Sequence, residues 1–175
     1  MLDAQARGEV RLAIGRASDF YGPGGGLTYL GDYFWKPALR GRTVWSPVDP
    51  DALHTYHCIP DVAAALAALG SAPDDALGRA WMLPCRPAES MAVLVDRLAR
   101  HLGRPIKIAR VPRILLSGLS LVVPLVRELQ EMAYQWEEPF VVDDRRFRER
   151  FGLEPVGADE AARATVEWAR GAYPA

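Results

Sequence analysis

The chain has 175 residues, half of them hydrophobic and a quarter charged, a balance typical of a globular domain with a buried core. Its 21 basic and 22 acidic residues give a formal net charge of −1. No overall field therefore favours nucleic acid or an anionic membrane, and neither is expected as a partner.

Cysteine usage and apolar runs limit the compartment. Cys58 and Cys85 have no CxxC or other metal-site spacing, so we expect free thiols in a reducing compartment and no bound metal. Residues 1–8 are polar, so no secretory signal is expected there. The longest apolar run, 114–126, is too short to span a bilayer and contains Pro124. These features predict a cytoplasmic protein.

In the first half of the chain, hydrophobic patterns predict strands and helices in turn. Alternation predicts a strand at 10–14, and the Gly/Pro cluster at 21–26 predicts a loop. We then expect a helix at 27–39, strands at 43–45 and 54–59, and a helix that begins with Pro60-Asp61 and ends at Gly70.

The second half continues the alternation and indicates a mixed α/β fold. We expect a strand at 79–83, an amphipathic helix at 89–102, a strand at 106–111 and an extended piece at 141–142. A long helical stretch from 112 to about 136 is expected to kink at Pro124. Two further helices are predicted at 144–151 and 159–172, the last capped by Asp159.

Glycine clustering does not predict a phosphate-binding loop. Gly22–Gly26 lacks the offsets of the GxGxxG fingerprint within a βαβ unit. His57 and His101 have no second metal ligand at helical or strand spacing, so we expect them to be packing or surface residues.

Three ordered motifs resemble a known family. Residues 16–23 resemble the Arg-x-x-Asn-x-Tyr-Gly-Pro element of extended short-chain dehydrogenases/reductases, and 54–63 resembles the next landmark, a strand followed by Asp61 and a helix. Residues 143–155, followed by Thr-Val-Glu-Trp at 165–168, resemble the family's tail. The chain is therefore similar to the C-terminal, substrate-side part of an NAD-dependent epimerase/dehydratase.

The resemblance implies a partial Rossmann-type parallel sheet with a smaller helical substrate-binding lobe over residues 1–175. It also implies that the N-terminal cofactor-binding half is absent. The family's Tyr-x-x-x-Lys pair does not occur, because Lys36 and Lys107 are the only lysines and neither follows a tyrosine by four residues. No catalytic residue is expected here. NAD or NADP serves the full-length family, and this chain alone is not expected to bind it.

The same resemblance implies a site for a small-molecule substrate. Its substrate-binding residues would be Ser18, Asp19, Phe20, Tyr21, His54 and Trp136, and its cofactor contacts Ala17 and Ser18. Two departures matter: Asp19 replaces the family's Asn, and His54 stands where sugar-nucleotide enzymes often carry Arg. A neutral imidazole lacks the bidentate fork for a diphosphate, which argues against a nucleotide-sugar substrate. Alternatively, Asp19 only caps the following turn.

The leading functional hypothesis is the substrate-binding portion of an NAD(P)-dependent epimerase/dehydratase-like oxidoreductase or isomerase, inactive alone. Two alternatives remain open: a non-catalytic small-ligand binding or regulatory module, and a truncated reading frame. A sheet without its N-terminal strands would expose an edge that pairs with another chain, so we expect either a homodimer or poor solubility when the chain is expressed alone.

Overall fold

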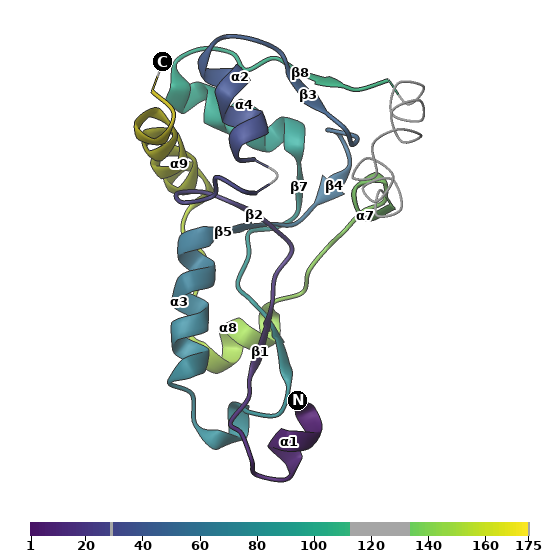
Figure 1. The fold of residues 1–175 in the computed structure, drawn as a ribbon, viewed down its shortest axis with the longest axis vertical. Coiled ribbons are helices and arrows are strands. Elements are labelled where there is room, and N and C mark those ends of the chain that lie inside the picture. The colour runs from purple at the N-terminus through teal and green to yellow at the C-terminus, as the bar shows by residue number, and fades with distance from the viewer. Residues whose placement is uncertain (29, 113–133, 175) are drawn as a thin grey trace.

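A computed structural model describes residues 1–28, 30–112 and 134–174. The molecule is elongated, and its N- and C-termini lie at opposite ends (Figure 1). The described strands form four two-stranded pairs. Three pairs are parallel and the fourth is antiparallel; the parallel ones are β1 (Ile14–Arg16) with β6 (Ala80–Met82), β2 (Asp19–Tyr21) with β5 (Tyr56–Cys58), and β3 (Val44–Ser46) with β8 (Ile108–Arg110), and the antiparallel one is β4 (Leu53–His54) with β7 (Glu89–Ser90).

The N-terminal end of the molecule is a small α/β layer. Helix α3 (Ile59–Gly70) packs on β1 and β5, and α8 (Arg145–Phe151) packs on β6. Pro60 occupies the first turn of α3, where its missing N–H costs nothing. A separate hydrophobic cluster fills this layer, with Leu69, Trp81, Leu83 and Phe147 among its buried members.

The C-terminal end is mainly helical (Figure 1). It contains α2 (Asp32–Leu39), α4 (Met91–Leu102) and α9 (Ala158–Ala172). The face of α9 that packs against α4 carries small residues, which lets the two helices approach closely. Helix α4 begins where the Ser90 hydroxyl accepts a hydrogen bond from Val93 N, and it ends at Gly103, whose φ is 77°.

Short elements complete the described chain. They are α1 (Leu2–Ala6), the 3-10 turn η1 (Asp74–Ala76) and α7 (Tyr134–Glu137). The expected α/β fold, with parallel sheet pieces and a smaller helical lobe, is confirmed. The long helix expected at 112–136 lies outside the described residues except at its two ends. Its Pro124 kink and the apolar run 114–126 lie outside them entirely.

Two expected elements begin later than their patterns indicate. The first strand is Ile14–Arg16 rather than 10–14, because the residues before it do not form a regular strand ladder. Leu12 N donates to the side-chain oxygen Oε1 of Gln5, and Gly78 N donates to Leu12 O. Helix α2 begins at Asp32 rather than 27, because residues 22–28 and 30–31 form turns and bends in which Gly25 N donates to Gly22 O and Thr28 N donates to Gly25 O. At Gly31, an added Cβ would clash with the carbonyl oxygen of Gly26, so the loop requires glycine there.

Smaller corrections concern element ends. The strand expected at 54–59 is divided into β4 and β5, and residues 89–90 of the expected helix form β7. Asp159 does not cap α9, whose N-cap is Gly157; its carboxylate accepts from His101 Nε2 at 3.0 Å instead. Both cysteines are free and buried. Within the described ranges, no cluster of metal-binding side chains occurs and no helix is long and apolar enough to cross a membrane.

Candidate functional site

The junction between β1 and β2 is fixed by a buried histidine. The Ser18 backbone N–H donates to Nδ1 of His57 over 3.1 Å, so Nε2 carries the ring proton and donates to the Leu83 carbonyl oxygen at 3.1 Å. Burial lowers the pKa of His57 and outweighs the opposing hydrogen bond. The neutral ring thereby ties the carboxyl ends of β1 and β6 to β5.

Next to it lies a polar cluster around His54. Nε2 of His54 lies 3.0 Å from the Ser18 hydroxyl and 3.1 Å from Oδ2 of Asp19. Oδ2 also accepts from the indole N–H of Trp136. His54 is buried, stacks on Phe140 with ring centroids 5.3 Å apart, and its Nδ1 has no hydrogen-bond partner among the described residues.

This cluster does not have the geometry of a nucleophilic triad. In a triad the base uses one ring nitrogen for the nucleophile and the other for the carboxylate. Here Ser18 and Asp19 both contact the same nitrogen of His54. The arrangement instead holds a hydroxyl and a carboxylate side by side, which suits recognition of a polar ligand group.

Asp19 remains an ionised acceptor. Its burial alone would raise the pKa, but hydrogen bonds from His54 and Trp136 outweigh it and lower the pKa of Asp19 below its ordinary value. The Asp19 side chain keeps 28% exposure. Its carboxylate bonds across to His54 in β4 and to Trp136 in α7.

A cleft of about 680 Å³ opens beside this cluster. It lies where the carboxyl ends of β1 and β6 meet α3 and the segment after Phe140. Most of its lining is apolar, and its polar groups come from Arg16, Ser18 and Asp143. Hydrogen bonds that Arg145 donates to the carboxylate of Asp143 are the main reason why the pKa of Asp143 is lowered to about 2. Such a cleft suits a ligand with an apolar body and a few polar groups.

The expected site residues fall into three groups. Ala17, Ser18 and Phe20 line the cleft. Asp19, His54 and Trp136 belong to the adjoining polar cluster, and Ser18 connects the two groups. Tyr21 is buried in the core at 3% exposure and does not line the cleft, although it follows directly in β2.

Sequence reasoning missed the segment that closes the cleft. The strand at His54 makes a parallel bridge with Phe140, and Thr55 Oγ1 accepts from Val142 N at 3.0 Å. These contacts between residues 140–142 and the His54 strand place Phe140 and Asp143 in the lining of the cleft. The only signal in the sequence was the Val141-Val142 pair, which indicated an extended piece but not its neighbour.

The glycine loop does not fit a dinucleotide phosphate. It follows β2, but nine residues, 23–31, lie between Gly22 and α2, and its glycines approach their own loop: an added Cβ at Gly25 would lie 3.0 Å from Gly22 O. Asp32 places a negative charge in the first turn of α2, where a pyrophosphate would need the positive end of the helix.

Comparison with solved structures identifies the fold. RMD from Pseudomonas aeruginosa, complexed with NADPH, matches with a TM-score of 0.69 and 14% identity over 98% of this chain and 51% of its own. MoeE5 in complex with UDP-glucuronic acid and NAD gives 0.69 and 21% over 98% and 52%. UDP-glucose 4-epimerase from Thermus thermophilus, in complex with NAD, gives 0.64 and 20% over 97% and 49%.

The fold is that of the extended short-chain dehydrogenases/reductases. The Rossmann-like α/β architecture implied by the three sequence motifs is confirmed. The chain spans about half the length of the solved chains it matches. No family model matches the sequence, and no curated protein matches it.

Proposed function

We propose that this chain is the substrate-binding portion of an NAD(P)-dependent epimerase/dehydratase-like oxidoreductase or isomerase. The observation that carries the proposal is the junction at Ala17–Ser18, where two parallel strand pairs meet, a cleft opens and a hydroxyl and a carboxylate lie together. Open α/β sheets bind ligands at the carboxyl ends of their strands.

In this proposal the Ser18 hydroxyl and the Asp19 carboxylate bind a polar group of the substrate, and Phe20 and Phe140 form apolar walls. His54, which is buried against both polar groups, positions them. NAD or NADP is the cofactor of the complete enzyme, with Ala17 and Ser18 at its edge. The chain alone has no turnover and binds the dinucleotide weakly, because its glycine loop offers no phosphate cradle.

The proposal includes a cytoplasmic location, supported by the two free, buried cysteines. It also includes a homodimer, because within the described residues β1 pairs on one side only, with β6. Light scattering on the purified chain tests this last point, and a monomer at high concentration would count against it.

A titration with two probes tests the assigned site. Glucuronic acid is added to isotope-labelled protein and followed by NMR, and NAD is titrated by calorimetry. We expect saturable glucuronic acid shifts around Ser18 and Phe20, weakened about tenfold, or 1.4 kcal/mol, in Asp19→Asn. Asp96→Asn, on the exposed face of α4, is the matched control. Low-micromolar NAD binding, or equal loss in both variants, would overturn the assignment.

The second candidate is a non-catalytic module that binds a small ligand. It is favoured by one observation, the lack of a Tyr-x-x-x-Lys pair in these 175 residues. The two functions differ in what restores activity. Turnover on joining this chain to a cofactor-binding half supports the enzyme portion, and ligand binding without turnover supports the module.

A further inference from the structure

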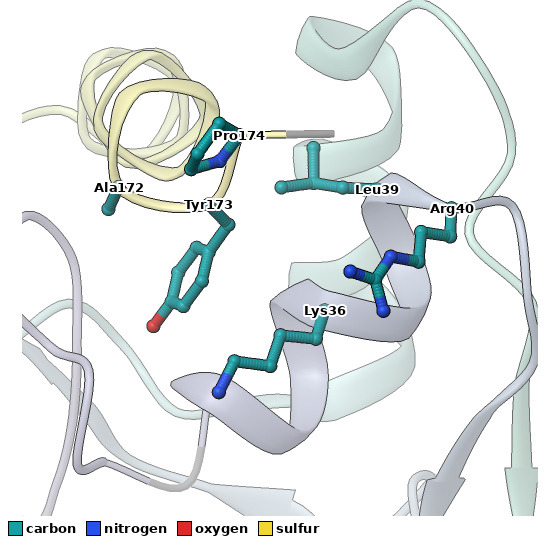
Figure 2. Close-up of a pocket in the computed structure, with 6 residues that line it drawn as sticks. All are labelled: Lys36, Leu39, Arg40, Ala172, Tyr173 and Pro174. Atoms are coloured by element: carbon teal, nitrogen blue, oxygen red, sulfur yellow. The ribbon is translucent and has the colours of Figure 1, made fainter.

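A second cavity lies at the helical end of the molecule. It has a volume of about 190 Å³ and opens between the last turn of α2 and the C-terminal end of α9 (Figure 2). Its lining consists of Lys36, Leu39, Arg40, Ala172, Tyr173 and Pro174. None of these residues lines the cleft at the β1–β2 junction, so the two sites are separate.

Arg40 brings a positive charge to this cavity. Its guanidinium extends between Lys36 and Leu39 toward the side of the cavity that holds Tyr173 (Figure 2). Among the described residues, the guanidinium makes no ion pair or side-chain hydrogen bond. A guanidinium presents a planar fork that matches a carboxylate with two parallel hydrogen bonds.

The charge of Arg40 is not needed to cap its own helix. The C-terminal carbonyls of a helix attract cations, and this role would explain an arginine at the end of α2. Here Arg104 satisfies the helix C-terminus instead, because its Nη2 donates to the carbonyl oxygens of Ala38 and Leu39. The end of α2 is therefore already satisfied by a residue from outside the cavity.

The opposite wall is held in place by Asp32. Its carboxylate accepts the Tyr173 hydroxyl at 2.8 Å and pairs with Lys36 one helical turn away. The Tyr173 ring also packs edge-on against Trp168, with centroids 5.7 Å apart. Because Lys36 neutralises Asp32, the charge that the described residues leave facing the cavity is that of Arg40. A cavity with a free cation and fixed aromatic and aliphatic walls favours an anion with an apolar part.

We propose that this cavity binds a small organic monocarboxylate, with its carboxylate on Arg40 and its aliphatic part against Leu39, Tyr173 and Pro174. The volume equals that of about six water molecules at roughly 30 Å³ each, which admits a short aliphatic acid and excludes a dinucleotide. The site does not depend on the function proposed above, since the two cavities share no residue.

Titration with sodium butyrate, monitored by NMR at constant ionic strength, tests this assignment. We expect saturable shifts of the Leu39 methyl groups, with a dissociation constant on the order of 10 mM because the site is open to solvent. Butanol and butylammonium should cause no saturable shift there. Arg40→Gln should weaken butyrate binding at least threefold, whereas Arg42→Gln, an exposed arginine outside the cavity, should leave it unchanged.

Three results would overturn the proposal. They are the lack of saturable butyrate shifts in the wild-type protein, equal weakening by both arginine substitutions, and tighter binding of inorganic phosphate than of butyrate at the same residues. Circular dichroism spectra of the two variants establish that each is folded, so that a loss of binding in Arg40→Gln reports on the guanidinium itself.

Discussion

Replacing His57 with phenylalanine measures how much the hydrogen bonds of His57 at the β1–β2 junction contribute to the free energy of unfolding. His57 is fully buried and satisfies two backbone groups, the N–H of Ser18 and the carbonyl of Leu83. Phenylalanine keeps the ring but leaves both groups without a partner. Each buried orphan costs about 1–3 kcal/mol, giving about 2–6 kcal/mol in total. Burial of the more apolar phenylalanine ring offsets part of this loss. We therefore expect the free energy of unfolding to fall by about 2–4 kcal/mol, the lower half of that range.

Urea unfolding followed by circular dichroism provides the measurement, with the slope m expected to be unchanged. The matched control is His101→Phe. The His101 side chain is 22% exposed, and it pairs with an Asp159 carboxylate that is 73% exposed. Loss of that surface pair should cost less than about 1 kcal/mol. A His57→Phe protein as stable as the His101→Phe protein would refute the view that His57 holds the junction.

Three further predictions concern stability. Burial lowers the pKa of His57, so the unfolded chain binds more protons; the free energy of unfolding should be steady above about pH 7 and fall as the pH drops through about 6.5 toward the lowered pKa. A pH series of urea unfolding checks this, and His57→Phe should lose the dependence. Gly31→Ala should lower the melting temperature strongly because the new Cβ meets backbone, whereas Gly171→Ala, with open space in α9, should raise stability by about 0.5–1 kcal/mol. Arg97→Ala breaks a bidentate pair whose side chains are 15% and 22% exposed and should cost about 1–3 kcal/mol, against less than about 0.5 kcal/mol for the exposed Arg163→Ala; equal losses in urea would contradict this.

Helices with signals inside their own sequence were predictable. The expected bounds of α4 and α9 lie within two residues of the observed ones, because an apolar stripe repeats along each helix. For α4, Ser90 and Gly103 also mark the ends in the way that local capping requires. Such signals act between residues a few positions apart, so a single sequence contains them.

Elements that depend on distant contacts were predicted less well. The alternation at 10–14 indicated a strand, yet Val10 is exposed and pairing starts only at Ile14, where β6 is available. The apolar spacing after Gly26 indicated a helix, but the backbone of the loop folds on itself up to Gly31. In both places a local pattern continued beyond the region that tertiary contacts support.

For the candidate site, the family resemblance supplied what spacing could not. It brought Ser18, Asp19 and His54 together from positions 36 residues apart, and the structure places these three within hydrogen-bond distance. Trp136 also joins this cluster, through its indole N–H, and it does not line the cleft. The wall at Phe140–Asp143 could not be predicted, because it depends on a long-range bridge to the His54 strand.

The segment His54–His57 buries polar side chains at the centre of this chain, and the short strand pairs around it give the reason. The strand pairs there are only two or three residues long, so many backbone groups lack a ladder partner. Side chains replace the missing ladder: Thr55 accepts from Val142 N, and His57 binds Ser18 N and Leu83 O. His54 performs the same bridging for two side chains. Burying polar residues is favourable only when they are hydrogen-bonded, and here those bonds join the strand layer to the cleft. The hydrogen bonds that connect the candidate site and the polarity of this segment therefore both follow from the shortness of the strand pairs.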